Sequence, residues 1–536
     1  MHLHLHLWAV LFSLKASNLY PMKHHLRVIL IFLPLFLCAQ HIQWQQTLGG
    51  NREEHLFDAI STYDYGVLLA GSSVSEASGN KADGSVADLD YWLWKMTENG
   101  KLEWQKNFGG SGNDYLYSVS YTQDGGYILG GSSDSPAGHD KETDSYGKRD
   151  FWLLKLNPLG EMEWQRSYGG SEDDQLTAIR QTKDGGYWVA GTTSSGADGN
   201  KKSPAIGNTD IWVLRLDETG NVLWERTLGG LGRDATKAMQ LSEHGLWLVA
   251  HSHSGALHGQ AQVLLLDHEG NIKHDFFFGD SPTEPAGIAL TKNGHLVIAG
   301  SQTLQSEDET QTPETDYWAL AFDTEGVVLH EERLDLGTQD RATRMAPLPD
   351  GQLVLSGFSI GKQTLKEDYT LVSFSPTAKL HWKKQLQANA DDRLQQVVAT
   401  QDKGLLLAGT SNSIKAYDKS VTANGQLDYW ILKTRGIKRY TGEDGFAQEN
   451  GDTLQDDKRQ ISAFPIPAKR FVTVVVPFDF NEANLTVHDL GGRLIHHQPM
   501  ERRTEILDMK HWPQGIFILQ VIADEHTMER KIVKDE

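Results

Sequence analysis

The sequence has 536 residues, of which 71 are Asp or Glu and 50 are Lys or Arg, so its formal net charge is −21. This excess of negative charge argues against nucleic acid as a partner. The chain is too long for one ordinary hydrophobic core unless a repetitive architecture takes up most of it. Its 52 glycines and 15 tryptophans are typical of many short strands joined by tight turns, which favours an all-β fold.

Residues 1–39 hold two apolar runs and a second methionine, Met22. A start at Met22 gives an ordinary secretory signal peptide, with basic residues, an apolar run and a cleavage site ahead of Gln40. We interpret the residues before Met22 as an over-extended start. A signal anchor is the alternative, but an apolar run of about ten residues is well short of the ~20 that span a bilayer. The mature chain is therefore expected to have no transmembrane segment.

Cys38 is the only cysteine, and it lies at the end of this leader. A lipoprotein anchor on Cys38 is a second alternative, although Leu37 is bulky where such a cleavage site requires a small residue. A chain cut ahead of Gln40 would contain no cysteine, which excludes disulfides and thiolate metal sites.

A motif with Trp at its start and Gly-Gly at its end recurs with a period of 60 residues. Such self-similarity is the signature of a repeat architecture. The strong copies begin at Trp44, Trp104, Trp164 and Trp224, and weaker copies begin at His274, His330 and Trp382.

Each repeat then continues with three further β-type segments. One is half-alternating, the next follows a DGG-type turn, and the last begins with Asp-Tyr-Trp or a variant of it. Seven copies of four such segments predict a seven-bladed β-propeller over residues 40–436. A β-solenoid would need shorter and more uniform rungs, and separate small domains would each bury too little core.

The turns between segments predict how the strands pair. A tight, glycine-containing turn links each Asp-Tyr-Trp segment to the next tryptophan segment, so these two should form a hairpin. Residues 41–48 have no such segment before them, and Asp428–Thr434 has no tryptophan segment after it. We therefore expect the N-terminal strand to become the outer strand of the seventh blade and close the propeller.

The tryptophans and the Gly-Gly pair recur at the same position of each repeat, which favours a structural role for them. In the Asp-Tyr-Trp strands, Trp alternates with Leu or Val, which predicts packing between neighbouring blades. The tryptophans that begin the repeats could stack on sugars, but recurrence at one structural position favours packing. The Gly-Gly pair is expected to carry the chain from an outer strand to the next blade.

No recognised catalytic motif occurs in the structural context that it requires. No P-loop, dinucleotide-binding fingerprint or GxSxG elbow occurs in the required context. Paired carboxylates such as Asp173-Asp174 and Asp391-Asp392 recur at equivalent positions, whereas a catalytic dyad would occur once, so they are interpreted as turn and hydrogen-bonding residues.

Acidic loops precede the fourth segment in blades one to three, at residues 73–90, 133–150 and 194–210. They resemble calcium loops only loosely and lack the ligand spacing of an EF-hand, so a solvated insertion is the favoured interpretation. If these blades carry function, these loops on one rim are where it is expected.

Blade four departs from the repeat with three histidines, His251, His253 and His258. Because His251 and His253 are two residues apart, they would share a face of a strand and could hold zinc with His258 or a carboxylate. Drift in a weakened repeat is the favoured alternative. No other cofactor is expected.

Residues 437–462 are polar and without apolar periodicity, as expected of a linker. Strand patterns return in FPIPAKRFVTVVV, LTVHDLGGRLI, PQGIFILQV and ERKIVKDE. Residues 463–536 thus resemble the type A C-terminal sorting domain of the Bacteroidetes type IX secretion system. The sequence has Pro465-Ile466-Pro467 where the family usually has Pro-Asn-Pro, and Phe517 where it has Tyr.

The resemblance implies a small β-sandwich that the outer-membrane translocon recognises and that is usually cleaved on export. The repeats are also similar to those of about 60 residues in many exported Bacteroidetes proteins, a resemblance of architecture only.

The protein is therefore expected to be secreted or displayed at the cell surface, and to bind an extracellular glycan or protein. The alternative is a propeller enzyme acting on polysaccharide, a lyase or glycoside hydrolase, with its site in the central funnel. Funnel residues that depart from the repeat would favour the enzyme.

Overall fold

The computed structural model describes residues 42–435 and 460–535, except residue 87, residues 256–257, 305–312 and 363–364, and residue 401. The expected signal peptide and nearly all of the expected linker lie outside these residues. Within the described part of the chain, no helix is long and apolar enough to cross a membrane. The fold is all-β, with multiple four-stranded antiparallel sheets followed by small C-terminal sheets.

In most of the four-stranded sheets the strands pair in chain order. They are β2 (Glu54–Ser61), β3 (Val67–Ser73), β4 (Asp90–Met96) and β5 (Leu102–Phe108); β6 (Asp114–Tyr121), β7 (Tyr127–Ser133), β8 (Asp150–Leu156) and β9 (Met162–Tyr168); β10 (Asp174–Gln181), β11 (Tyr187–Thr193), β12 (Asp210–Leu216) and β13 (Val222–Leu228); β14 (Asp234–Ser242), β15 (Gly245–Ser252), β16 (Gln260–Leu266) and β17 (Ile272–Phe278). Two further groups, joined by one parallel bridge between Thr315 and Gln339, are β18 (Thr283–Leu290), β19 (Leu296–Thr303), β20 (Thr315–Phe322) and β21 (Val328–Leu334); and β22 (Gln339–Pro347), β23 (Leu353–Ile360), β24 (Glu367–Phe374) and β25 (Leu380–Leu386).

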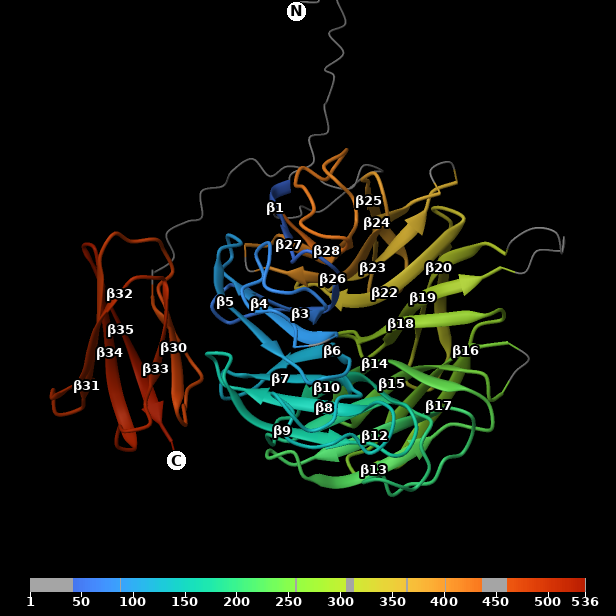
Figure 1. Cartoon of the computed structure of the whole chain (residues 1–536), viewed down its shortest axis with the longest axis horizontal. Helices are drawn as coiled ribbons and strands as arrows, with labels where there is room; N and C mark the ends of the chain where they lie inside the picture. The colour runs from blue at the N-terminus through green and yellow to red at the C-terminus, as the bar shows by residue number, and fades with distance from the viewer. Residues whose placement is uncertain are drawn as a thin grey trace, which may run out of the picture. The chain divides into compact units, whose positions relative to one another are not determined.

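One sheet combines strands from distant parts of the chain. It contains β26 (Asp392–Ala399), β27 (Leu405–Ser411), β28 (Asp428–Thr434) and β1 (Ile42–Leu48). β1 pairs with β28 in antiparallel register, with Leu48 opposite Tyr429, which is the pairing that the sequence predicts for these two segments. Figure 1 shows the sheets arranged around a common centre, with β6, β10, β14 and β18 toward it. We call the strands of a sheet inner, second, third and outer, from the centre outward.

The outer strands pair with the third strands before them, as predicted, and their tryptophans pack on the next sheet. The turn glycines Gly100 and Gly160 have φ of +78° and +75°. A Cβ on Gly100 would lie 3.2 Å from the ring of Trp44, and one on Gly160 would lie 3.2 Å from the ring of Trp104. The packing interpretation of these outer tryptophans is therefore confirmed.

The tryptophans of the third strands also pack between sheets. Each is buried against the aromatic residue one position earlier on the third strand of a neighbouring sheet. The pairs, with their centroid distances, are Trp92 with Tyr429 (4.9 Å), Trp152 with Tyr91 (4.8 Å), Trp212 with Phe151 (4.8 Å) and Trp430 with Tyr369 (4.6 Å). The predicted inter-blade packing is confirmed for these four.

Between sheets, the Gly-Gly pair passes two buried carboxylates. A Cβ on Gly109 would lie 2.0 Å from Asp90 Oδ1, and the amide of Gly110 donates to Asp114 Oδ2 at 2.8 Å. Glycine is thus required here because a side chain would collide with a carboxylate. We call each such passage a junction. The carboxylate pairs at the junctions include Asp428 with Glu54, Asp90 with Asp114, Asp150 with Asp174, Asp316 with Asp340 and Asp368 with Asp392.

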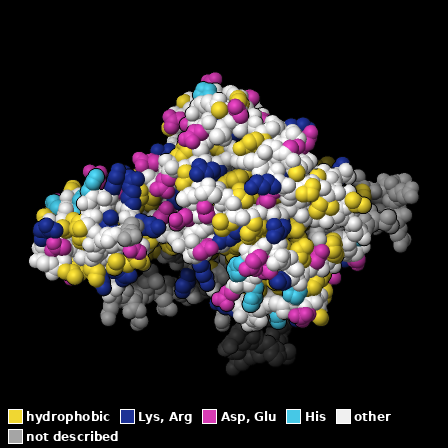
Figure 2. Space-filling model, turned by 90° about the horizontal axis from the view of Figure 1, so that it is seen from below, with side chains coloured by type: hydrophobic (Ala, Val, Ile, Leu, Met, Phe, Trp, Pro, Cys, Tyr) yellow, Lys and Arg dark blue, Asp and Glu magenta, His cyan; other side chains and the backbone are white. Residues whose placement is uncertain are grey.

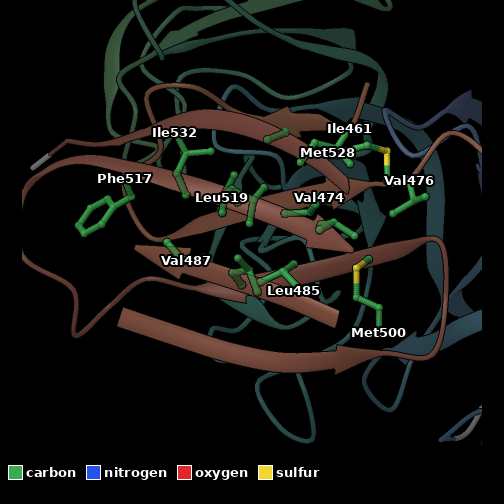
Figure 3. Packing of buried hydrophobic residues seen from close by; sticks show 14 of the residues in the cluster. Ile461, Val474, Val476, Leu485, Val487, Met500, Phe517, Leu519, Met528 and Ile532 are labelled. Carbon is green, nitrogen blue, oxygen red and sulfur yellow. The ribbon is translucent and has the colours of Figure 1, made fainter. Parts of the chain in front are cut away.

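The C-terminal region forms two small sheets. One contains β29 (Ser462–Phe464), β30 (Phe471–Val475) and β33 (Thr504–Asp508); the other contains β31 (Ala483–Asp489), β32 (Leu494–Met500), β34 (Gly515–Ala523) and β35 (His526–Lys534). Buried side chains from both sheets, among them Val474, Leu485 and Leu519, form a single core (Figure 3). Phe517, at the family's usual Tyr position, is only 2% exposed and packs on Trp512, so no hydroxyl is needed there.

Removing β1 tests how far the molecule depends on it. A chain that begins at residue 49 should lose at least about 3 kcal/mol of unfolding free energy, because it exposes the aromatic face of β28 and removes the ring of Trp44. Urea unfolding followed by tryptophan fluorescence measures this against a chain that begins at residue 42. Equal midpoints for the two chains would contradict the prediction.

The junction carboxylates predict an unusual dependence on pH. Burial, together with a neighbouring carboxylate, raises the pKa of Asp114, Asp150 and Asp392 to about 6. Because the folded state holds these protons more tightly than the unfolded chain, whose Asp pKa is about 3.9, stability should fall as pH rises from about 4 to about 6. Burial lowers the pKa of His251 to about 4, so this one histidine has the opposite effect and makes stability rise with pH.

Melting temperatures between pH 4.5 and 7.5 measure this effect. The wild type should be more stable at pH 5 than at pH 7, by on the order of 1–2 kcal/mol per pair. Asp114→Asn should reduce the slope, since asparagine cannot titrate. A stability that rises steadily over this range would refute the assignment.

Candidate functional site

The inner strands present a face whose side chains differ from sheet to sheet. In β2, β6, β10 and β26 the first and third residues are buried, while the second and fourth keep some exposure. Since side chains alternate along a strand, the second and fourth residues share one face, which we call the inner face. In β22, which begins one residue earlier, the equivalent positions are the third and fifth. The residue pairs of the inner face are His55 and Phe57, Tyr115 and Tyr117, Gln175 and Thr177, Ala235 and Lys237, Glu284 and Ala286, Arg341 and Thr343, and Arg393 and Gln395.

Aromatic residues gather on the inner face where β2 and β6 meet. The rings of Phe57 and Tyr117 meet edge to face at 5.0 Å, and those of Tyr115 and Tyr117 stack at 5.9 Å. His55 stacks on Phe57 at 6.4 Å, and the guanidinium of Arg149 lies 5.8 Å from the centroid of Tyr115. We call these five residues the aromatic–arginine group.

Arg149 and Tyr117 hold defined protonation states in this group. Arg149 Nε donates to Asp173 Oδ1 at 3.1 Å, which fixes its guanidinium beside Tyr115. Burial raises the pKa of Tyr117 to about 12, so its phenol stays protonated near neutral pH. The group therefore offers flat aromatic surfaces, a hydrogen-bond donor and a cation, which together suit a polar ligand with an apolar face.

Next to this group, polar side chains join inner strands that lie far apart in the sequence. Arg344, on β22, donates from Nε to the carbonyl of Phe57 at 3.1 Å and from Nη2 to that of Tyr117 at 2.7 Å. Asp58 accepts from the amide of Val119 at 3.1 Å and from Gln396 Nε2 at 3.0 Å. We call Asp58, Arg344 and Gln396, with Arg180, the central cluster.

Arg180 adds a second guanidinium to the central cluster. Its Nη1 donates to Ser118 Oγ at 3.1 Å and to the carbonyl of Ile179 at 2.7 Å. Burial and then nearby Arg344 lower the pKa of Arg180, while Asp58 opposes them. Two arginines against one carboxylate leave the cluster with one positive charge in a protein of net charge −21. On the outer surface seen in Figure 2, by contrast, acidic and basic side chains are interspersed.

The central cluster holds neighbouring strands together. Asp58 also accepts from the amide of Ala59 at 2.9 Å, so three donors engage its carboxylate. Two of these donors, the amide of Val119 and Gln396 Nε2, come from β6 and β26, so Asp58 links β2 to both of these strands.

The acidic loops contain buried lysines that sequence analysis did not single out. Lys141 is 1% exposed, and its Nζ donates to the carbonyl of Ser135 and to Ser145 Oγ, both at 2.7 Å. Lys81 makes the equivalent bonds to Ser75 and Ser85. An ammonium thus occupies the interior of these loops, where a calcium loop would hold its ion. The sequence signal was a lysine that repeats every 60 residues, at 81, 141 and 201.

The three histidines are only partly brought together. The rings of His251 and His253 lie 4.6 Å apart between centroids, and burial lowers the pKa of His251 to about 4, which keeps it neutral. His258 Nδ1 is buried without a hydrogen-bond partner. In the described part of the chain, however, the one group of three or more metal-ligating side chains with atoms all within 4.8 Å of one another is Asp316, Asp335 and Asp340. A zinc site at the histidines stays a prediction.

The paired carboxylates have the structural role that was predicted. Asp174 begins β10 and accepts from the amide of Gly170 and from Ser195 Oγ, and Asp392 accepts from Ser413 Oγ in the same way. The inner-face residues, by contrast, were not predicted as a site. Their signal was departure from the repeat at the second and fourth positions of the inner strand.

The C-terminal region matches a known protein family. Residues 462–535 match the family model for the secretion system C-terminal sorting domain. No curated protein matches the chain.

The solved structures that align with this chain are distant. PorZ, a surface component of the type-IX secretion system of Porphyromonas gingivalis, aligns at 11% identity and a TM-score of 0.38, over 91% of this chain and 60% of its own. The β-propeller domain of the Trilobed protease from Pyrococcus furiosus aligns at 8% identity and a TM-score of 0.39, over 73% of this chain and 97% of its own. A fungal alcohol oxidase of the AA5 family aligns at 11% identity and a TM-score of 0.42, over 92% of this chain and 100% of its own. Likeness at this level says nothing about activity.

This chain thus covers about 60% of the length of the PorZ structure. Its C-terminal region is a type IX sorting domain, carried behind a β-propeller-like region. Such a domain implies export across the outer membrane, to the cell surface or the medium.

Proposed function

We propose that the protein is an exported, seven-bladed β-propeller, closed by its N-terminal strand, that binds an extracellular glycan or protein through the inner face. The strand contacts support the closed architecture. The inner strands contact one another in the order β2, β6, β10, β14, β18, β22 and β26, and β26 contacts β2 again. Each of these seven strands begins a group of four strands, and the groups that begin with β18 and β22 are joined by the bridge between Thr315 and Gln339.

β1 also performs the tasks of an outer strand. Gln45 Oε1 accepts from Trp430 Nε1 at 3.0 Å, as Gln105 and Gln165 accept from the third-strand tryptophans of their own sheets. The ring of Trp44 covers Gly100, as the ring of Trp104 covers Gly160. These matching contacts support a seventh blade completed by the N-terminus, with the propeller spanning residues 40–436.

The observation that carries the binding role is the aromatic–arginine group. A repeat that served only to build the ring would place equivalent residues at equivalent positions, yet β2 and β6 alone present His, Phe and Tyr on the inner face. Tyr and Arg are also the residues that contribute most at binding surfaces. An oligosaccharide, especially one with carboxylate or sulfate groups, fits flat rings beside a cation.

A polysaccharide lyase or glycoside hydrolase is the second candidate, because the same departure from the repeat would also build an active site. His55 and the tyrosines could exchange protons, and Arg149 could stabilise a developing negative charge. The hydrogen bonds that hold Asp58 between β2, β6 and β26 suit a fixed binding surface, which supports the binding role.

A glycan array on the purified propeller, run beside assays for reducing ends and for unsaturated products, tests the two candidates together. Tyr115→Ala should weaken binding at least tenfold by removing a stacking surface. Tyr146→Ala is the matched control, since Tyr146 is an exposed tyrosine of the loop in the same sheet and should bind as wild type does. Equal affinity of the two variants would contradict the assigned surface, and product release would establish the enzyme instead.

Export can be tested separately from binding. Deleting residues 463–536 in a host with a type IX system should leave the protein in the periplasm, because the translocon then has no sorting domain to recognise. Immunoblots of periplasm, cell surface and medium would show the shift. Undiminished export of the deletion variant would contradict the proposal, whatever the propeller binds.

A further inference from the structure

We infer that Asp316, Asp335 and Asp340 form a calcium site at the junction between β20 and β22. This site is separate from the inner face and from the histidines, and the binding role does not depend on it. The three carboxylates supply ligand oxygens that all lie within 4.8 Å of one another, which is the span of ligands around an ion bound at about 2.4 Å.

The other junctions show what a buried carboxylate pair requires. Lys81 lies beside Glu54 and Asp90, and Lys141 lies beside Asp114 and Asp150. Lys201 and Lys419 serve the two neighbouring sheets in the same way. A buried charge is tolerated when an opposite charge is close, so these ammonium groups offset the negative charge of the pairs.

At the junction between β20 and β22 this lysine is missing. The buried lysines of the described residues all lie in other sheets, and none belongs to β18–β25 or to the described loops between these strands. The cations that face the group are Lys362, which pairs with Asp335 at 2.9 Å and is 53% exposed, and Arg333, which binds Asp280. Glu314 adds a further negative charge nearby.

Instead of a lysine, this junction gains a third carboxylate. Asp335 replaces the first glycine of the Gly-Gly pair, five residues before the inner-strand aspartate, just as Gly109 and Gly169 precede Asp114 and Asp174. At those two glycines a Cβ would lie 2.0 and 1.8 Å from a third-strand carboxylate oxygen. A side chain at this backbone position therefore points toward the carboxylate pair, and at the junction between β20 and β22 that side chain is Asp335.

The oxygens of the pair are also available to an ion. Asp316 is 6% exposed and Asp340 is 0% exposed, and Oδ1 of each is buried without a hydrogen-bond partner. Asp90 and Asp114 have similar unpartnered oxygens, but their junction has its lysines. Burial and the charges of Asp316 and Asp335 together raise the pKa of Asp340 to about 6. Hard carboxylate oxygens select calcium over zinc.

Isothermal titration calorimetry of the full chain with Ca²⁺ tests this site. The protein is first treated with EGTA, and Mg²⁺ is the comparison ion. We expect one bound Ca²⁺ per chain with a dissociation constant of roughly 10⁻⁴–10⁻³ M, the range of extracellular modules. At saturating Ca²⁺ the melting temperature should rise by a few degrees, because the ion binds only the folded state.

Asp335→Asn separates an ion site from a merely structural cluster. Its partly exposed side chain can be changed without opening the core, and the variant should lose Ca²⁺ affinity at least tenfold while melting higher than wild type in EGTA. Asp391→Asn, an acid next to the following junction pair, is the control and should keep the wild-type response. Absence of Ca²⁺ binding by the wild type, or equal binding by Asp335→Asn, would overturn the inference and leave a pair that shares a proton.

Discussion

The burial of two carboxylates at a junction is the constraint on which the rest of the architecture depends. Each pair joins the start of a third strand to the start of the next inner strand, and both groups are withdrawn from water. Burying a carboxylate without hydrogen-bond donors would be strongly destabilising, and neighbouring residues supply these donors. The amide of Gly110 and the hydroxyl of Ser135 both bond to Asp114, and the same arrangement recurs around Asp174.

This constraint explains several features that at first look unrelated. At Gly109 and Gly169 the first glycine is needed because the backbone passes within contact distance of a carboxylate. At Gly229, whose φ is +138°, the backbone conformation also favours glycine. The serines after the second strands are needed as donors. The lysines in the acidic loops balance charge, and their loops fold around them instead of around a metal ion. At Asp335, where both the glycine and the lysine are missing, three carboxylates lie together without a buried lysine beside them in the described part of the chain.

The same repetition that builds the sheets leaves the inner face free to vary. Interlocking tryptophans and glycines hold neighbouring sheets together at their outer edges, while the second and fourth residues of the inner strands contribute little to that packing. Aromatic side chains can therefore gather on β2 and β6 without weakening the fold. In a protein with a net charge of −21, the guanidinium of Arg149 lies beside these rings.

The sequence by itself determined the all-β class, the four strands in each repeat, the pairing of outer with third strands and the type IX sorting domain. These follow from local information, because the repeat length, the turn glycines and the alternation of apolar residues all act between residues near one another in the chain. The partner of the first tryptophan strand could also be deduced, since one strand was left over at each end. Only the tertiary structure decided which side chains meet across sheets. Arg344 reaches Phe57 and Tyr117 from far along the chain, and Asp335 meets Asp316 across a junction, because positions that repeat in sequence become neighbours only when the sheets are arranged around a common centre.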